Sequence, residues 1–302
     1  MKVAFLFPGQ GAQDVGMGQE AWGQYDSVKK VFEQASEILG YSISDVCFNG
    51  PAEKLNSTVI SQPALFVTSM AAVEVLKHTN PEAIENCAGV AGLSLGEYSA
   101  LAFSGAISFE EGLKLVQKRG EAMQAAADAT PSGMASLLGL DPEKVAEVCE
   151  AARVDGEVLQ PANYLCPGNI AVSGHKASCE KVVEVANEAG AMKVIPLTVA
   201  GAFHTSIMDP AVESLKQAVD QTAFSDSNVP VYCNVDAAVH QSGSEFGPLL
   251  VKQICSPVRW HDSMNAMLND GYDEFYEVGT GRILRGLLKR INRKLPTHGT
   301  LN

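Results

Sequence analysis

The chain has 302 residues, 46% of them hydrophobic, so it can bury one large core, or one large core plus a small inserted one. Its 35 acidic and 22 basic residues give a formal charge of -13, which disfavours nucleic acid as a partner. The seven cysteines are odd in number, scattered and free of Cys-x-x-Cys pairs. This pattern excludes a zinc ribbon or disulfide framework and is typical of a reducing compartment.

The N-terminus runs directly into an apolar stretch at residues 3–7, preceded only by Lys2 and followed by glycines and a proline. This pattern predicts a buried first strand rather than a signal peptide. We expect no apolar run long enough to cross a bilayer. A cytoplasmic protein without a membrane partner is therefore predicted.

Strand and helix signals alternate through the first part of the chain. Residues 2–7 and 88–93 read as strands, whereas residues 26–39 and 64–78 read as helices. Such alternation favours an α/β layer built on a parallel sheet.

The pattern changes character between about residue 131 and residue 199. Asp141 is a predicted N-cap with Pro142 at the first helical position. The predicted elements follow the order strand, helix, strand, strand, helix, strand, over residues 134–140, 142–152, 158–164, 169–174, 176–189 and 192–199. This βαββαβ order is that of the ferredoxin-like unit.

The α/β character returns from Gly201, with a strand at 274–278 and a helix at 282–293. We therefore predict a large α/β domain formed by residues 1–130 and 200–302. A small ferredoxin-like domain of residues 131–199 is inserted into it.

The segment Gly92-Leu93-Ser94-Leu95-Gly96 follows a predicted strand and precedes a helical stretch. In a Gly-x-Ser-x-Gly turn between strand and helix, the serine hydroxyl projects at the end of the sheet. The helix N-terminus behind it favours negative charge on an oxyanion. This context favours Ser94 as a nucleophile over a serine on a purely structural turn.

A glycine-rich loop, Gly9-Gln10-Gly11, follows the first strand. It lacks the third glycine of the dinucleotide fingerprint, since Asp14 stands there, and no Gly-Lys-Ser/Thr follows. The loop therefore fits neither a dinucleotide-binding site nor a P-loop. The loop can present the backbone N–H of Gln10 to an oxyanion, or it can serve as a structural turn alone.

Arg119 falls on the apolar side of a helix predicted to begin at the capping box of Ser108 and Glu111. It shares that side with Val116 and Met123. A buried guanidinium needs an anionic or strongly polar partner. Local sequence leaves two readings equally open: a structural salt bridge, or a fork that binds a substrate carboxylate.

Of the six histidines, His204 stands out, because Gly201-Ala202-Phe203-His204 follows the predicted return to the large domain. Domain junctions line clefts, and imidazole is the usual base for a serine nucleophile. From position alone, a structural histidine is at least as well supported as a catalytic one.

The predicted C-terminal helix combines an apolar stripe, in which Ile283 is included, with a basic cluster. The cluster comprises Arg282, Arg285, Lys289, Arg290, Arg293 and Lys294. Two interpretations stay open for it: a solvated face, or a surface that guides an acidic partner.

Taken in order, these motifs resemble those of malonyl-CoA:acyl-carrier-protein transacylases. The resemblance spans nearly the whole chain and rests on Phe7-Pro8-Gly9-Gln10-Gly11-Ala12-Gln13, Gly92 to Ala100, Arg119-Gly120, Gly201-Ala202-Phe203-His204, Gln253 with Pro257-Val258, and Glu277-Val278-Gly279. It implies an α/β-hydrolase-like large domain with a ferredoxin-like small one. It also implies malonyl transfer from malonyl-CoA to the phosphopantetheine thiol of acyl carrier protein, for fatty-acid or polyketide synthesis, without metal or cofactor.

The resemblance also implies roles for individual residues. Ser94 is the nucleophile and His204 the general acid and base, oriented by the main-chain carbonyl of Gln253. Arg119 is the clamp for the malonyl carboxylate. Two further implied roles are an oxyanion hole from the backbone amides of Gln10 and Leu95, and malonyl selection by Phe203.

The chain departs from the family pattern at two positions. Leu93 stands where the family usually has histidine, and Leu165 stands where asparagine is common. Two other functions stay open: a serine hydrolase with a carboxylate behind its histidine, and a non-catalytic protein that docks a carrier.

Overall fold

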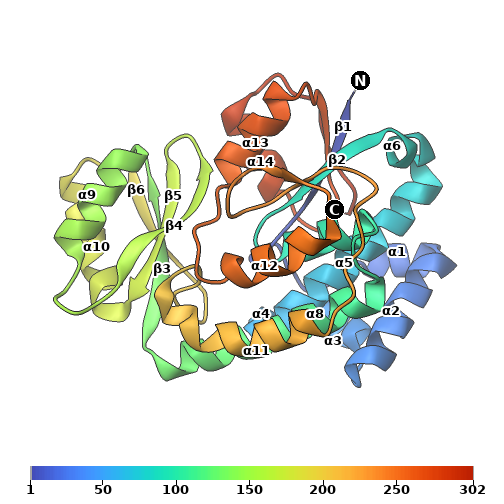
Figure 1. Cartoon of the computed structure of the whole chain (residues 1–302), viewed down its shortest axis with the longest axis horizontal. Coiled ribbons are helices and arrows are strands. Elements are labelled where there is room, and N and C mark those ends of the chain that lie inside the picture. The colour runs from blue at the N-terminus through green and yellow to red at the C-terminus, as the bar shows by residue number, and fades with distance from the viewer. Residues whose placement is uncertain (1, 302) are drawn as a thin grey trace.

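The computed structural model describes residues 2–301. Its larger part is built on a six-stranded sheet with the order β10-β9-β1-β2-β7-β8 (Figure 1). All neighbouring strands are parallel except the β7–β8 pair. The strands are β1 (Val3–Phe7), β2 (Cys87–Gly92), β7 (Val231–Tyr232), β8 (Val239–His240), β9 (Glu274–Glu277) and β10 (Thr297–Gly299).

Helices surround this sheet. The first group is α1 (Gln19–Gln24), α2 (Asp26–Leu39), α3 (Ile43–Asn49), α4 (Ala52–Asn56), α5 (Thr58–Thr79), α6 (Pro81–Glu85), α7 (Gly96–Phe103) and α8 (Phe109–Ala129). The second group is the 3-10 turn η1 (Ser206–Met208), α11 (Asp209–Asp220), α12 (Gly243–Gln253), α13 (Trp260–Asn269) and α14 (Ile283–Ile291). Figure 1 shows α8 and α11 running side by side below the sheet, and these two helices are in contact.

The segment between α8 and η1 forms a second, four-stranded sheet with the order β4-β5-β3-β6, and all its pairs are antiparallel. It lies at the left of Figure 1 beside its two helices. Its elements are β3 (Ser132–Leu138), α9 (Pro142–Ala152), β4 (Leu159–Cys166), β5 (Asn169–His175), α10 (Lys176–Glu188) and β6 (Lys193–Leu197). They follow the predicted strand and helix order, with ends displaced by a few residues.

Helix α5 differs from the prediction in two ways. It begins at Thr58, six residues before the predicted start, and carries Pro63 in its second turn. The helix is also long and apolar enough to cross a membrane by length and composition, so the expectation that no such run exists was wrong. However, 83% of its most apolar window is buried in the protein, where it packs against α2, α7 and α8. This burial is typical of a core helix.

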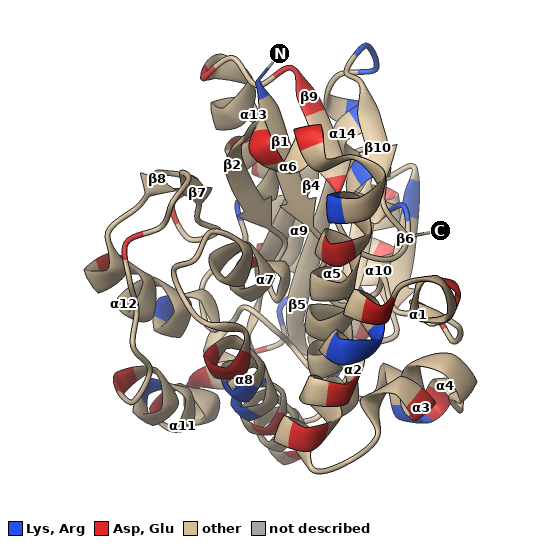
Figure 2. Ribbon diagram, turned by 90° about the vertical axis from the view of Figure 1, so that its right-hand side faces the viewer, with Lys and Arg blue, Asp and Glu red and all other residues tan. Residues whose placement is uncertain are grey.

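Two predicted helix starts have the expected caps. Ser108 accepts a hydrogen bond from the Glu111 N–H, and the Glu111 carboxylate accepts one from the Ser108 N–H. Asp141 caps α9 by accepting from the Lys144 N–H. Acidic and basic residues are interspersed along α2, α8 and α11 (Figure 2). The capping box fixes where α8 begins, and thereby the rotational position of Arg119 about three turns later.

Candidate active site

Three motifs meet at one edge of the large sheet, where the parallel strands β1, β2 and β7 end. Phe7, the last residue of β1, is in register with Gly92, the last residue of β2. Gln10 follows the first strand, Ser94 the second, and Asn234 the third. Carboxyl ends of neighbouring parallel strands lie together, which is why segments far apart in sequence converge here.

Ser94 lies in a sharp turn between β2 and α7, with left-handed backbone at φ 52°. Such a conformation strains a residue other than glycine and is found at nucleophile turns. The two flanking glycines permit the turn. A Cβ at Gly92 would lie 1.9 Å from the backbone of Gly96, and one at Gly96 would lie 2.0 Å from the carbonyl oxygen of Phe7. Larger residues at either position would push the serine away from the sheet edge.

The loop after β1 packs closely against the Ser94 turn. A Cβ at Gly9 would lie 2.2 Å from the Leu93 carbonyl oxygen, and the Leu93 N–H donates to the Phe7 carbonyl. Gln10 is thereby held beside Ser94, and both line the same cavity. Among residues 2–301, neither the Gln10 N–H nor the Leu95 N–H donates a hydrogen bond in the turns around the site. Both groups are free to bind an oxyanion.

His204 joins Ser94 to Gln253. Its Nδ1 lies 2.9 Å from the Gln253 carbonyl oxygen, and its Nε2 lies 2.9 Å from the Ser94 Oγ. A carbonyl can only accept, so Nδ1 carries the proton and Nε2 must accept from the Ser94 hydroxyl. Gln253 ends α12, where helical carbonyls lack partners within the helix. The Gln253 carbonyl, which also accepts from the Ser256 N–H at 3.3 Å, fixes the tautomer in which His204 can act as a base.

The His204 imidazole is only 2% exposed. Burial, and to a smaller extent the nearby Arg119, together lower its pKa to about 4, against the opposing effect of the hydrogen bond to the Gln253 carbonyl. The ring is therefore neutral at pH 7 and ready to accept a proton.

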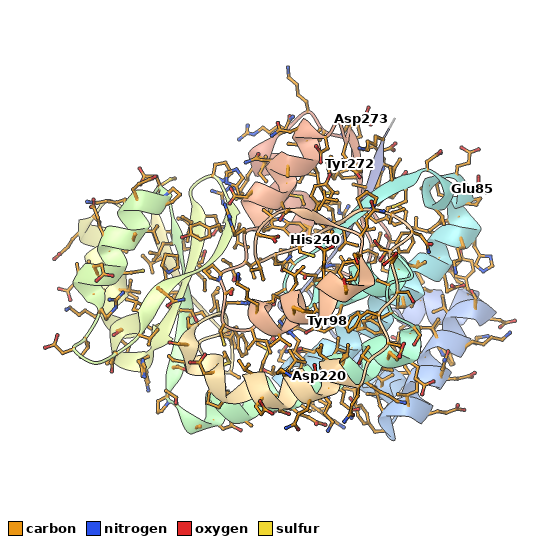
Figure 3. All side chains as sticks on the ribbon, in the orientation of Figure 1. Glu85, Tyr98, Asp220, His240, Tyr272 and Asp273 are labelled. Carbon is orange, nitrogen blue, oxygen red and sulfur yellow. The ribbon has the colours of Figure 1, made fainter. Side chains whose placement is uncertain are left out.

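Arg119 lies in α8, is 1% exposed, and contacts only neutral groups through its guanidinium nitrogens. One nitrogen donates to the Gln62 carboxamide oxygen at 2.8 Å. The other donates to the Ser94 Oγ at 2.9 Å and to the Gln253 carboxamide oxygen at 3.0 Å. The guanidinium lies 5.4 Å from the centre of the Tyr98 ring. Tyr98 is labelled in Figure 3. Among residues 2–301, no carboxylate lies within 4.0 Å of Arg119.

These groups line a cavity of about 90 Å³ that both sheets help to form. From the large sheet and its helices come Gly9, Gln10, Leu93, Ser94, Arg119, Met123, Phe203 and His204. From the smaller sheet and its exit come Met134, Asn163, Leu197 and Val199. The Asn163 side-chain oxygen is buried and has no hydrogen-bond partner among the described residues. The cavity is small and mostly apolar, and its lining includes the guanidinium of Arg119.

Sequence reasoning missed three polar residues of the site. Asn234 accepts from the Ser94 N–H at 2.7 Å, and Gln62 orients Arg119. Glu97 is fully buried and accepts from Asn234 and Gln253. Asn234 follows β7, the strand next to β2 in the sheet, so a correct prediction of β7 could have located this residue. Glu97 was visible as an acidic residue in an otherwise apolar helix, but no signal indicated its partners.

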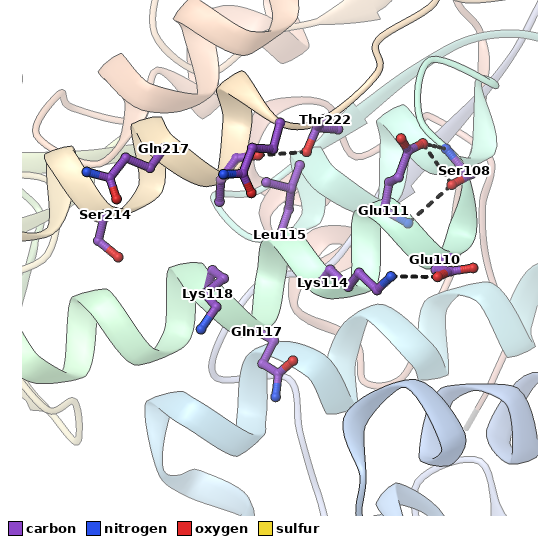
Figure 4. A pocket seen from close by; sticks show the side chains of 12 residues that line it. Ser108, Glu110, Glu111, Lys114, Leu115, Gln117, Lys118, Ser214, Gln217 and Thr222 are labelled. Atoms are coloured by element: carbon purple, nitrogen blue, oxygen red, sulfur yellow. Dashed lines mark hydrogen bonds and ion pairs between the residues drawn. The ribbon is translucent and has the colours of Figure 1, made fainter.

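A larger hollow, with a volume of about 820 Å³, lies elsewhere, between α8 and α11. Its charged side chains pair with close neighbours: Lys114 with Glu110, and Lys118 with Glu121. Figure 4 shows the first of these pairs, with Glu111 bonded to Ser108. Within residues 2–301, no cluster of three or more His, Cys, Asp or Glu side chains could hold a metal ion.

Comparison with known proteins gives consistent matches over the whole chain. The acyl transferase domain family matches residues 4–290. Malonyl CoA-acyl carrier protein transacylase of Bacillus subtilis (strain 168) is 42% identical over 298 residues, covering 98% of this chain and 92% of that protein.

Two solved structures are also similar. The acyl-carrier-protein S-malonyltransferase of Bartonella henselae has a TM-score of 0.95 at 36% identity, covering 99% of this chain and 95% of that one. A malonyl-transacylase in complex with its type II PKS acyl-carrier protein has a TM-score of 0.93 at 34% identity, covering 99% of this chain and 95% of that one.

Proposed function

This chain belongs to the family of malonyl-CoA:acyl-carrier-protein transacylases, and from that membership we propose that Ser94, His204 and Arg119 carry out its reaction. The enzyme transfers a malonyl group from malonyl-CoA to the phosphopantetheine thiol of acyl carrier protein, in support of fatty-acid or polyketide synthesis. A single observation carries the residue assignment. One serine hydroxyl contacts both a neutral imidazole and a buried guanidinium that has no carboxylate partner among residues 2–301.

The first half-reaction forms an ester on Ser94. His204 Nε2 takes the hydroxyl proton as Oγ attacks the thioester carbonyl carbon, and the tetrahedral oxyanion is stabilised by the N–H groups of Gln10 and Leu95. The carbon–sulfur bond then breaks. His204 returns the proton to the departing coenzyme A thiolate, which leaves malonyl-Ser94. The low pKa of His204 supports this role, because the imidazolium formed in the first step gives up its proton readily.

The second half-reaction reverses these steps with a different thiol. His204 takes the proton of the carrier's phosphopantetheine thiol as its sulfur attacks the ester, and then returns the proton to Ser94 Oγ as the ester bond breaks. Water must not replace that thiol. The small size of the cavity and its apolar lining by Met123, Met134 and Phe203 support exclusion of water from the ester.

Arg119 gives the site its preference for a carboxylated acyl group. An unpaired buried guanidinium is costly, and a malonyl carboxylate can bind it through two parallel hydrogen bonds. The neutral contacts made by Arg119 leave its positive charge uncompensated by direct contact until such a substrate enters. Phe203 lines the same cavity, where its ring supports selection of malonyl over bulkier acyl groups.

The two sheets support a finer description of the fold. We infer an α/β-hydrolase-like large domain from residues 1–130 and 200–302, with a ferredoxin-like small domain at 131–199. The four-stranded antiparallel order and the βαββαβ sequence of elements support the second assignment. We also infer a cytoplasmic location, a carrier protein as partner, and no nucleic-acid or membrane partner.

Intact-mass measurement after mixing with malonyl-CoA tests the assignment directly. The wild-type enzyme should gain the mass of one malonyl group, and Ser94→Ala should gain none while keeping the same thermal midpoint. An adduct on the alanine variant would overturn the nucleophile assignment. A serine hydrolase predicts instead that malonyl-Ser94 decays in water as fast as it transfers to holo-carrier. The carbonyl behind His204, in the place of a hydrolase's carboxylate, favours transfer.

A further inference from the structure

Glu97 is a buried acidic residue for which the proposed reaction has no direct use. It lies in the first turn of α7, three residues after Ser94, and its side chain is inaccessible to solvent. Within residues 2–301, no lysine, arginine or histidine lies within 4.0 Å of its carboxylate. A buried carboxylate without a cation is costly, so its hydrogen bonds must account for its presence.

One oxygen of Glu97 makes both of its hydrogen bonds. Oε2 accepts from the Asn234 backbone N–H at 2.8 Å and from the Gln253 side-chain amide at 3.1 Å. The other oxygen, Oε1, is buried and has no partner among the described residues. Glu97 therefore acts through a single acceptor atom shared by two segments, the loop after β7 and the end of α12.

The Asn234 contact bears on the nucleophile. The Asn234 carboxamide oxygen accepts from the Ser94 N–H at 2.7 Å, and its nitrogen donates to the Gly92 carbonyl at 2.7 Å. These two bonds span the turn in which Ser94 has left-handed backbone. Glu97 holds the Asn234 backbone and so fixes the side chain that supports this turn.

The Gln253 contact bears on the other two active-site residues. The Gln253 amide nitrogen donates to Glu97 and to the Ser94 carbonyl, whereas its amide oxygen accepts from Arg119. An acceptor at Glu97 sets which end of this carboxamide faces Arg119, because the reversed carboxamide would oppose oxygen to oxygen and nitrogen to guanidinium. The Gln253 backbone carbonyl in turn orients His204.

We propose that Glu97 is a positioning residue of the transacylase, and that its Oε2 atom acts as the shared acceptor that holds Asn234 and Gln253 in the orientations required by Ser94, His204 and Arg119. This inference rests on the proposed function. The role belongs to the position of the acceptor and not to its negative charge. Burial raises the Glu97 pKa to about 7, against the opposing effects of the Asn234 N–H, the Gln253 amide and Arg119. The neutral form is thus accessible near pH 7, consistent with an acceptor role that needs no full charge.

Two substitutions separate acceptor position from charge. Glu97→Gln keeps the length and one carbonyl oxygen but loses the charge, and its amide nitrogen takes the place of the unpartnered Oε1. Glu97→Asp keeps the charge but withdraws the oxygens by about 1.5 Å, one carbon–carbon bond. Glu110→Gln, at an exposed position on α8, controls for the exchange of glutamate for glutamine.

The measurement is the rate of acyl-Ser94 formation from malonyl-CoA and from acetyl-CoA, followed by intact mass and divided by the fraction of enzyme that acylates at completion. We expect Glu97→Asp to lower the malonyl rate at least about tenfold, the lower range for a hydrogen bond to a charged group. It should also reduce the malonyl-to-acetyl ratio, because Arg119 loses its orientation. Glu97→Gln should be at least about threefold faster than Glu97→Asp and keep the wild-type ratio.

Three results would overturn the inference. Loading by Glu97→Asp at the wild-type rate and ratio would show that Glu97 only fills space. A malonyl rate for Glu97→Gln at or below that of Glu97→Asp would assign the role to charge. A parallel loss of both acyl rates, with the ratio unchanged in every variant, would indicate a general structural role. Failure of the wild-type enzyme to form a Ser94 adduct would instead contradict the proposed function itself, which keeps the two failures distinct.

Discussion

Replacement of Arg119 by alanine removes a buried cation from the lining of the acyl cavity. In the empty enzyme the guanidinium donates to Gln62, Gln253 and the Ser94 Oγ, none of which is charged. When malonyl-CoA binds, its carboxylate becomes the anionic partner. Truncating one partner of such a desolvated charge pair costs roughly 2 to 5 kcal/mol. Malonyl loading of Ser94 should therefore slow by about thirtyfold or more.

The assay compares single-turnover loading of Ser94 from malonyl-CoA and from acetyl-CoA by quenched intact mass. Acetyl-CoA lacks the terminal carboxylate, so its slow reaction should be unchanged or improved in Arg119→Ala. Lys118→Ala is a matched control on the same helix, because Lys118 is exposed and pairs only with Glu121. Exposed pairs of this kind contribute about 1 kcal/mol or less, so loading should hold near the wild-type rate. An equal loss for both acyl groups in Arg119→Ala would refute the carboxylate clamp and indicate a structural cation.

The pKa of about 4 for His204 predicts that malonyl loading stays level from pH 7 to pH 5 and falls by half near pH 4, since only the neutral ring accepts the Ser94 proton. A half-maximal rate near the ordinary histidine pKa of 6.5 in a stopped-flow pH series would contradict this. Leu93→His should change turnover only modestly, and a gain from no activity to full activity would favour the non-catalytic docking alternative. Reversal of the exposed Lys289 and Arg290 to glutamate should weaken carrier use at low salt and leave malonyl loading unchanged, because exposed charges act mainly on encounter. If that reversal leaves carrier kinetics unaffected, the basic cluster of α14 is a solvated face and does not guide carrier docking.

The sequence could predict the parts of the site that follow from local rules. Ser94 was found from a glycine-flanked turn, and the burial of Arg119 followed from its phase along α8. Strands β8 and β10 were not predicted, because two or three residues carry no readable alternation. In α14, Ile283 is 39% exposed and not part of the buried stripe, since it lies in the first turn beside the glycine-rich loop.

Tertiary context accounts for the other differences. Arg285 belongs to the predicted basic cluster, yet it pairs with the buried Glu277 at 3.3 Å and is not free to meet a partner. The carboxylate of Glu277 also accepts from the Leu284 and Arg285 N–H groups at the start of α14. This pair joins the end of β9 to the start of α14 across a turn and leaves no periodic pattern in the sequence, so composition alone could not separate Arg285 from its exposed neighbours.

The position of β1 in the large sheet has a consequence for synthesis of the chain. Its neighbour β9 comes from the far end of the protein, and Lys2, beside β1, bonds Asp273, 271 residues away. During translation β1 therefore emerges well before β9, and its edge stays unpaired until the segment that carries β9 has left the ribosome. Pairings at such separations form slowly and expose strand edges to aggregation in the interim. A stalled or truncated chain that ends before β9 keeps Ser94 and His204 but lacks the strand beside the Gln10 loop, so such fragments should be cleared rather than act as partial enzymes.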